Sequence, residues 1–274
     1  MDITVGITTH NDYDGVFFTI QALRMYHGLT KFIVIDQCPS SEYGKLTRRF
    51  VEKEVRGEYV PYPFQLGPSH GRNEIMRRAS GWVLMVDGHV LLEDGAIGIA
   101  QNCPRWIAPT DLIQGPLLYD SLDAYATHWT PGWNQECFGT WATDERLHHE
   151  RPFEIPMQGV GLMLVHTDHW PGYNKDFRGF GGEEWYIHRK YRKQGGRTLC
   201  LPGLRWNHRF GRMPHSTYPI NRVDKIFNHL LGDIELDDWQ QFREDCDHWS
   251  AFALPSTQQA LQMLKQGNYI KCVA

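Results

Sequence analysis

Three short apolar runs in the first third of the chain constrain its fold more than any other feature. They cover residues 3–9, 31–37 and 82–88, and they are rich in β-branched side chains. The segments between them carry apolar residues at helical spacing, and parallel strands need such crossover connections. The pattern therefore predicts an α/β protein with a mainly parallel central sheet flanked by helices.

Local signals set the expected bounds of the other elements. Residues 14–28 end on Gly28, which is typical of a helix C-cap, whereas residues 69–81 open with Ser69 as a candidate N-cap and end at Gly81. Further along, we expect only short strands in 98–156, a buried strand in 157–170, a glycine turn and helix in 179–196, a short strand in 197–203, and amphipathic helices after 220, of which 233–249 is an acidic surface helix.

Polar residues stand at the expected carboxyl ends of the strands. Because parallel strands all end at one edge of the sheet, α/β proteins bind their ligands there. The sequence therefore predicts a ligand site at the edge that carries Thr8, Thr9, His10, Asp36 and Asp87.

The third apolar run stops at Asp87-Gly88-His89. A carboxylate and an imidazole two residues apart on a strand point to the same side, and Gly88 leaves room for a ligand between them. Carboxylate oxygen and imidazole nitrogen suit Mn²⁺ or another first-row ion, especially when phosphate oxygens complete the coordination. The alternative is a tight turn in which Asp87 and His89 satisfy backbone groups only.

Composition narrows the class of protein. The 274 residues are 41% hydrophobic and 22% charged, which is typical of a globular protein with one large domain. A net charge of −4 gives no overall attraction to nucleic acid, and six scattered cysteines predict neither a disulfide framework nor a zinc ribbon. Without a signal sequence or a membrane-length apolar stretch, we expect a cytoplasmic protein of a microbe, or of a virus in its host cytoplasm.

Two longer blocks resemble known glycosyltransferases. Residues 67–95 resemble the segment of GT-A glycosyltransferases that contains the metal-binding DxD or DxH motif, and residues 174–212 resemble the catalytic domain of polypeptide N-acetylgalactosaminyltransferases and family-2-like glycosyltransferases. The resemblance extends over about 3–232, with Glu184 where the family has Asn. The matching residues are Gly67, Arg72, Asn73, Ala79, Gly81, Asp87 and His89 in the first block, and Gly181, Gly182, Glu183, Arg189, Gly195, Gly196 and His208 in the second.

The resemblance implies a domain plan and an activity. A GT-A catalytic domain would span 1–232, with a nucleotide-sugar half in about 1–95 and an acceptor half in about 96–232, followed by a helical extension in 233–274. It would transfer a sugar from a nucleotide-diphosphate donor, first of all a UDP-sugar, with Mn²⁺ or Mg²⁺ as cofactor. The implied metal ligands are Asp87, His89 and His208, with His215 and His10 as competitors for the third place.

The resemblance also assigns roles around the donor. Thr8, Thr9 and His10 would lie near the base, Asp36 near the base or ribose, and Arg72 beneath the base or phosphates. Gly88 and Gly182 would also line the nucleotide-sugar site, Arg209, Arg212 and Tyr218 would clamp the diphosphate as a lid, and Trp129, Trp133 and Trp141 are candidates for contact with the donor sugar.

Glu183 and Glu184 are the candidate catalytic residues. In an inverting reaction one of them would act as general base on the acceptor hydroxyl. In a retaining reaction, which the resemblance favours, the leaving phosphate takes the proton and the glutamate positions the sugar. Both acids stand at the start of a predicted helix, where interaction with the helix dipole is the structural alternative.

The acceptor and two other activities stay open. A glycan, a peptide, a small molecule or the hydroxymethylated bases of modified DNA would each fit, and the basic runs in 72–78 and 188–197 are candidates for phosphate contacts. A nucleotidyltransferase is a rival class, but residues 8–15 lack the glycine-rich, lysine-containing loop that it needs. A binding module without turnover is a further rival, although Asp87, His89 and Glu183 are intact.

Overall fold

The computed structural model describes residues 1–64, 66–102 and 106–270, and its centre is an eight-stranded sheet in the order β11-β13-β6-β12-β4-β1-β2-β3. The pairs β3-β2, β2-β1, β1-β4 and β13-β6 are parallel, whereas β12 runs antiparallel to both of its neighbours. These strands are β1 (Ile3–Thr9), β2 (Phe32–Asp36), β3 (Glu58–Pro61), β4 (Trp82–Asp87), β6 (Leu112–Gln114), β11 (Phe153–Glu154), β12 (Leu162–His166) and β13 (Thr198–Cys200).

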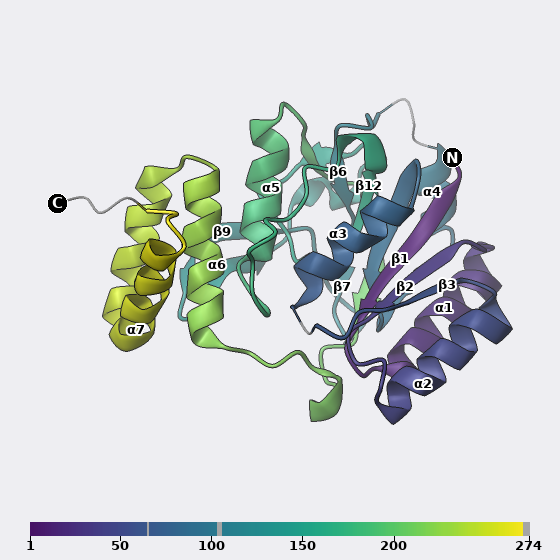
Figure 1. Cartoon of the computed structure of the whole chain (residues 1–274). Coiled ribbons are helices and arrows are strands. Elements are labelled where there is room, and N and C mark those ends of the chain that lie inside the picture. Colours follow the sequence, from purple (N-terminus) through teal and green to yellow (C-terminus); the bar gives the residue numbers. More distant parts are fainter. Residues whose placement is uncertain (65, 103–105, 271–274) are drawn as a thin grey trace.

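Helices cover both faces of this sheet, because successive side chains of its buried strands point to opposite sides. Val34 packs with the core under one set of helices, whereas Ile33 and Ile35 pack with the core under the other set. Figure 1 shows α6 and α7 side by side at one end of the molecule and α1 and α2 at the other. The first set is α1 (Tyr13–His27), α2 (Glu42–Arg49) and α4 (Ala96–Asn102), and the second is α3 (Pro68–Arg78), α5 (Glu183–Lys193), α6 (Arg222–Glu235) and α7 (Trp239–Gln266).

Two smaller sheets flank the carboxyl edge of the main sheet. One has the order β5-β14-β7-β8, and the other is the hairpin of β9 and β10. The bounds are β5 (Val90–Leu92), β7 (Leu117–Leu118), β8 (Tyr125–Ala126), β9 (His128–Asn134), β10 (Cys137–Ala142) and β14 (Trp206–His208), and the single-turn elements are η1 (Phe50–Val55), η2 (Glu145–His148), η3 (Thr167–His169) and η4 (Pro214–Ser216).

The structure confirms the predicted α/β class, the three strands β1, β2 and β4, and the helix that ends on Gly28, which is left-handed. The prediction of Ser69 as an N-cap is wrong. Gly67 caps α3 and Pro68 is its first residue, because proline's fixed φ suits that position and needs no N–H partner. The same helix ends at Arg78, before Gly81.

The predicted acidic surface helix 233–249 is also wrong. Helix α6 ends at Glu235, and α7 begins at Trp239 after a turn in which Asp237 has a φ of 54°. Asp233 and Asp245 are buried, because Arg189 and His229 lie against them. The expected boundary at 232/233 falls inside α6, which runs from Arg222 to Glu235.

Among the described residues, no helix combines the length and the apolar character that crossing a membrane requires.

Candidate active site at the carboxyl edge of the sheet

A cavity of about 320 Å³ lies where β1 and β4 end, between the first turn of α5 and the loop that follows β14. Most of the residues that the sequence predicted for the site line this cavity. They are Thr8, Thr9, His10, Arg72, Asp87, Gly88, His89, Gly182, Glu183, Glu184, His208, Arg212 and Tyr218, together with the sugar candidates Trp129 and Trp141.

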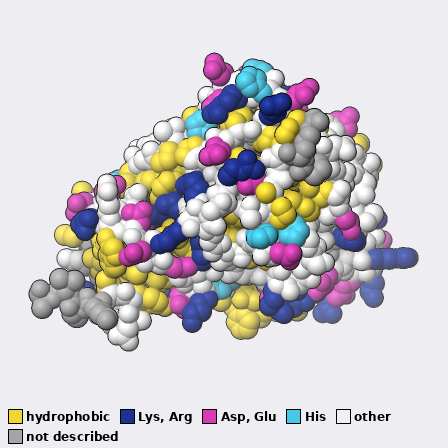
Figure 2. All heavy atoms as spheres, turned by 90° about the horizontal axis from the view of Figure 1, so that it is seen from above, with side chains coloured by type: hydrophobic (Ala, Val, Ile, Leu, Met, Phe, Trp, Pro, Cys, Tyr) yellow, Lys and Arg dark blue, Asp and Glu magenta, His cyan; other side chains and the backbone are white. Residues whose placement is uncertain are grey.

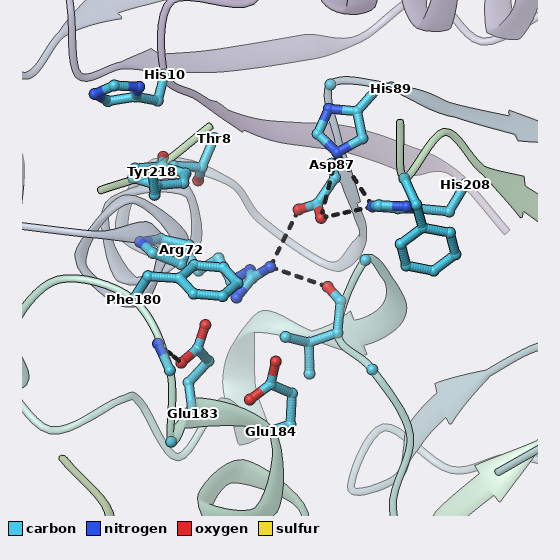
Figure 3. A pocket seen from close by; sticks show the side chains of 18 of the residues that line it. Thr8, His10, Arg72, Asp87, His89, Phe180, Glu183, Glu184, His208 and Tyr218 are labelled. Carbon is cyan, nitrogen blue, oxygen red and sulfur yellow. Dashed lines mark hydrogen bonds and ion pairs between the residues drawn. The ribbon is translucent and has the colours of Figure 1, made fainter. Parts of the chain in front are cut away.

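The three candidate metal ligands converge on one point of this cavity (Figure 3). His89 Nε2 lies 3.1 Å from His208 Nε2 and 3.9 Å from Asp87 Oδ2, and His208 Nε2 lies 3.5 Å from the same carboxylate oxygen. An ion with bonds of about 2.1 Å at right angles holds adjacent ligand atoms roughly 3.0 Å apart. The distance between the two imidazoles matches this value and the two distances to Asp87 Oδ2 are longer, so small side-chain movements would let the three groups hold Mn²⁺ or Mg²⁺.

Strand pairing explains how His208 reaches the DxH turn, which lies 119 residues earlier in the chain. Strands β5 and β14 are antiparallel, with His208 opposite Val90, and Arg209 N donates a hydrogen bond to His89 O at 3.1 Å. Because β5 follows the turn at once, this ladder fixes the two imidazoles on either side of Asp87.

Asp12 holds His89 in place and was not among the predicted site residues. One of its oxygens accepts the Gly15 N–H at the start of α1, and the other accepts the Nδ1 hydrogen of His89 at 3.0 Å. A hydrogen bond at Nδ1 leaves the Nε2 lone pair of His89 directed at the candidate ion position. The sequence indicates Asp12 as an N-cap, because it stands just before a helix. Its contact with His89 depends on the tertiary fold and is not visible in the sequence.

Gly88 has a packing role as well as a place in the cavity wall. A Cβ at this position would lie 2.9 Å from Val16 Cγ2 of α1, and a Cβ on Gly15 would lie 2.4 Å from Gly88 O. Val16 of α1 therefore occupies part of the space that a side chain at this position would need, while Gly88 also lines the cavity. The close approach of α1 is what brings Asp12 to His89.

Two arginines surround Asp87. Arg72 is buried, and its Nη2 donates to Asp87 Oδ1 at 3.2 Å and to Val160 O at 3.0 Å. Burial alone would raise the pKa of Asp87, but His208, Arg72 and His89 together lower it below its ordinary value, so the carboxylate is ionised. Arg212 Nη1 lies 2.6 Å from His89 Nε2, and a bound cation therefore requires this guanidinium to move.

Buried polar atoms without hydrogen-bond partners also lie along the cavity. Together with Arg72, Arg212 and the three candidate metal ligands, they form what we call the polar region. Thr8 Oγ1, Thr9 Oγ1, His10 Nδ1 and the Tyr218 hydroxyl are buried and have no hydrogen-bond partner within the described residues. The Tyr218 ring lies 4.9 Å from the His10 ring and is stacked on Phe180 at 6.1 Å. Buried polar groups without partners are rare in proteins, so these atoms are available to a polar ligand or to water.

Four of the expected residues lie outside the cavity wall. The Asp36 carboxylate accepts hydrogen bonds from Cys38 N and the Tyr59 hydroxyl. Arg209 Nη2 lies 3.5 Å from Asp12 Oδ1. The Trp133 ring is stacked on His248, and the His215 ring is stacked on Tyr43.

The two glutamates at the start of α5 point toward Arg72 from below (Figure 3). Glu183 Oε2 accepts the Gly181 N–H at 2.8 Å, whereas Oε1 is buried and has no hydrogen-bond partner in the part of the chain that the structure describes. Burial and the neighbouring Glu184 raise the pKa of Glu183 to about 8, and burial also raises the pKa of Glu184. The pair can therefore hold a proton near neutral pH, which suits acid–base work or a hydrogen bond to a sugar hydroxyl.

Several further lining residues were not predicted. They come from the β9-β10 hairpin, from α5 and from α6, and no short motif connects them. They include Phe138, Trp185, Lys225 and His229.

No protein-family model matches this chain, and no curated protein sequence matches it. Solved structures do resemble it. GalNAc-T7 with UDP, GalNAc and Mn²⁺ superposes with a TM-score of 0.62 and 16% identity, over 85% of this chain and 47% of that one, so the chain spans about half the length of GalNAc-T7. TarS from S. aureus in complex with UDP-GlcNAc superposes with a TM-score of 0.58 and 13% identity, over 100% of this chain and 82% of that one.

The mannosyltransferase PcManGT from Pyrobaculum calidifontis, in complex with GDP-Man and Mn²⁺, is similar with a TM-score of 0.54 and 12% identity, over 97% of this chain and 75% of that one. All three are glycosyltransferases with the same arrangement of sheet and helices. The chain therefore has the GT-A glycosyltransferase fold, as the sequence resemblance predicted.

Proposed function

We propose that this protein is a metal-dependent glycosyltransferase that moves a sugar from a nucleotide diphosphate, first of all UDP, to a hydroxyl acceptor. The observation that carries the proposal is the convergence of Asp87, His89 and His208 at the sheet edge where α/β proteins bind nucleotides. The structural relatives support it, since two of them hold Mn²⁺ and all three hold a nucleotide or nucleotide sugar.

The polar region would bind the donor. A divalent ion held by the three ligands would supply positive charge beside the leaving diphosphate. Arg72 adds a fixed, buried cation next to Asp87, and Arg212 would turn from His89 to the phosphates when the donor binds. Thr8, Thr9 and His10 offer their unpaired polar atoms to the base and ribose.

The glutamates would act on the sugar and the acceptor. Glu183 Oε1, which has no partner, is placed to hold a hydroxyl of the transferred sugar. We favour retention of configuration, in which the leaving phosphate takes the acceptor proton and the glutamates orient the sugar. With inversion, Glu183 or Glu184 would take that proton itself, and its raised pKa suits this role.

The pairing of the basic runs supports an acceptor other than modified DNA. In the run 72–78, Arg72 is paired with Asp87, and both Arg77 and Arg78 are paired with Glu74. In the run 188–197, the cations likewise bond internally. Their partners are Asp233 and Asp238 for Arg189, Glu235 for Lys190, Thr198 for Arg192, the Leu236 carbonyl for Lys193 and Asp111 for Arg197.

Figure 2 agrees with this pairing, because Lys and Arg side chains are interspersed with Asp and Glu on the face that it shows. A phosphate backbone binds to a continuous basic groove, and paired cations release less counterion when they meet it. The observed pairing therefore supports an acceptor other than nucleic acid.

The proposal is tested by donor hydrolysis over a panel of UDP-, GDP- and TDP-sugars, with Mn²⁺ or with chelator. The Asp87→Asn variant is compared with Asp168→Asn, which changes an exposed aspartate that also lies beside a histidine, outside the cavity. We expect one donor to be hydrolysed only with metal, with loss of turnover in Asp87→Asn alone. Hydrolysis that ignores both chelator and Asp87→Asn would refute the proposal.

A further inference from the structure

The cavity has a second region, which includes Trp129 and Trp141, the residues expected from the sequence to contact the donor sugar. Its wall is aromatic, and it is formed by the β9-β10 hairpin and the first turn of α5. The Trp129 and Trp141 rings meet edge to face with centroids 5.1 Å apart, and the Phe138 and Trp185 rings lie 5.2 Å apart. We call Trp129, Phe138, Trp141 and Trp185 the aromatic wall.

Two glycines give the aromatic wall its shape. A Cβ on Gly159 would lie 3.1 Å from Trp129, closer than ordinary contact, and 3.6 Å from Trp141, so a side chain there would crowd the Trp129 indole. Gly139 has a φ of 109°, and a Cβ on it would lie 2.8 Å from Trp129. The glycines at 139 and 159 therefore allow the rings to lie where a side chain would otherwise be.

His229 of α6 supplies a polar group beside the wall. It lines the cavity, its ring lies 6.4 Å from Phe138, and its Nδ1 lies 3.7 Å from Asp245 Oδ2. Asp245 is fully buried and accepts hydrogen bonds from Trp133 Nε1 and Gln241 Nε2. Burial, with Lys225 and Arg189 nearby, lowers the pKa of His229 to about 3, so the imidazole is neutral.

The aromatic wall and the candidate ion site have different neighbours. The ring contacts of Phe138 are with Trp133, Trp185 and His229, whereas those of His208 are with His89, Trp206 and Phe210. The donor sugar is tethered to a diphosphate at the ion site. A ligand that uses Phe138, Trp185 and His229 together is therefore better placed as the acceptor.

We propose that the aromatic wall with His229 is the acceptor subsite, and that it binds a sugar ring. A pyranose has an apolar C–H face that packs on aromatic rings and hydroxyls that hydrogen-bond a neutral imidazole, which is the mixture this region offers. The proposal rests on the proposed function, and it narrows the open set of acceptors to carbohydrates. His229, whose ring lies beside Phe138, is the positioning residue for one acceptor hydroxyl.

The test measures binding of methyl glycosides of glucose, galactose, mannose and N-acetylglucosamine by saturation-transfer NMR, with UDP and Mn²⁺ present. The variants are Phe138→Leu, which keeps an apolar side chain, and His229→Gln, which keeps a polar one. Trp239→Phe is the control, because Trp239 is a half-exposed aromatic residue at the start of α7, outside the cavity. Calorimetric affinity for UDP and thermal unfolding are measured on the same samples.

We expect at least one glycoside to bind, and to bind about threefold to tenfold more weakly in Phe138→Leu and in His229→Gln. The affinity for UDP with Mn²⁺ should be unchanged in both variants, and Trp239→Phe should match the wild type. His229→Gln should also lower the saturation transfer to the ring proton beside one hydroxyl more than to the other ring protons, which a loss of general packing would not do.

Four outcomes would overturn the subsite. UDP binding without binding of any glycoside would do so, while leaving the proposed function intact. Equal glycoside binding in the variants and the control would also do so. Displacement of the glycoside by a UDP-sugar but not by UDP would move the subsite to the donor sugar, and binding of a serine- and threonine-containing peptide in place of every glycoside would assign it to a peptide. Glycoside binding by a chain that does not bind UDP would instead refute only the proposed function.

Discussion

The two regions of the cavity are built in different ways. The candidate ion site uses Asp87 and His89 from one turn, a helix cap at Asp12, and a backbone ladder that fixes His208. The aromatic wall draws on β9, β10, α5 and α6, and ring packing holds it together. A site fixed by ladders and caps tolerates little change, whereas a packed wall can accept new side chains. We therefore expect donor chemistry to be the constant part of this molecule and acceptor choice the adjustable part.

The largest expected effect comes from His208→Gln. Loss of one of three ligands should lower metal-dependent turnover by about a hundredfold or more, which exceeds the usual effect of residues that only orient a ligand. Turnover at saturating donor and the apparent affinity for Mn²⁺ measure it. His149→Gln, at an exposed histidine outside the cavity, is the control. A His208→Gln enzyme as active as this control would show that the ladder does not serve a metal.

Asp12→Asn should weaken the ion site through His89. Asparagine keeps one oxygen for the Gly15 cap but cannot accept at both positions, so we expect about tenfold to a hundredfold lower affinity for Mn²⁺. Titration of Mn²⁺ in the presence of UDP measures this. Affinity for the glycoside should stay at the wild-type value, and a parallel loss at both sites would mean that the two regions are not independent.

Glu183→Gln tests whether the Glu183 carboxyl, which lines the same cavity, is buried and protonated. The measurement is the pH dependence of stability. The pKa of Glu183 is raised from 4.5 to about 8, so the folded chain holds this proton more tightly than the unfolded chain. This contribution is present below the ordinary pKa and is lost as pH rises toward about 8. Removing the carboxylate should therefore raise the melting temperature relative to wild type by about 2–4 °C more at pH 9 than at pH 4. The same difference at both values would argue against a buried, protonated Glu183.

Arg212→Ala should have opposite effects on two ligands. Without a guanidinium beside His89 Nε2, Mn²⁺ alone should bind a few times more tightly, because a competing cation is gone. UDP in the presence of Mn²⁺ should bind a few times more weakly, because a phosphate contact is lost. Calorimetry with each ligand distinguishes the effects, and a uniform change in both affinities would contradict this role.

The smallest effect is expected from added salt. A methyl glycoside carries no charge, so its binding should change by less than about twofold between 50 and 200 mM salt. Because the basic runs are paired within the protein, they should bind an oligonucleotide only weakly. A nucleic-acid acceptor would give a steep loss instead. Binding of a single-stranded oligonucleotide over the same range of salt is the measurement that decides between them.

The sequence predicted the parts of the fold that depend on local patterns. Strands β1, β2 and β4 and the helix ending on Gly28 follow from apolar periodicity and a left-handed glycine. The cap of α3 was misplaced because Ser69 is a strong local signal, yet Pro68 and the packing of Gly67 against Gly179 decide the start. The segment 98–156 resisted prediction because β7, β8 and β11 are only two residues long, and because β6, β7 and β11 pair with strands distant in the chain.

In the candidate site, too, the sequence indicates some residues, whereas others are brought together only by the fold. Asp87 and His89 stand next to each other in the sequence, and His208 entered only through the resemblance to glycosyltransferases. The contact of Asp12 with His89 joins residues 77 positions apart, and the aromatic wall joins segments without any shared motif. Such contacts arise from tertiary packing, so sequence periodicity does not reveal them.

The central claim is that Asp87, His89 and His208 hold a divalent ion for a nucleotide-sugar donor. Its most direct test is calorimetric titration of UDP into the wild type and into Asp87→Asn, each with Mn²⁺ and with chelator. The account predicts binding that requires Mn²⁺ in the wild type and is lost in Asp87→Asn, with both proteins folded. Equal UDP affinity in all four titrations, or none in any, would contradict it.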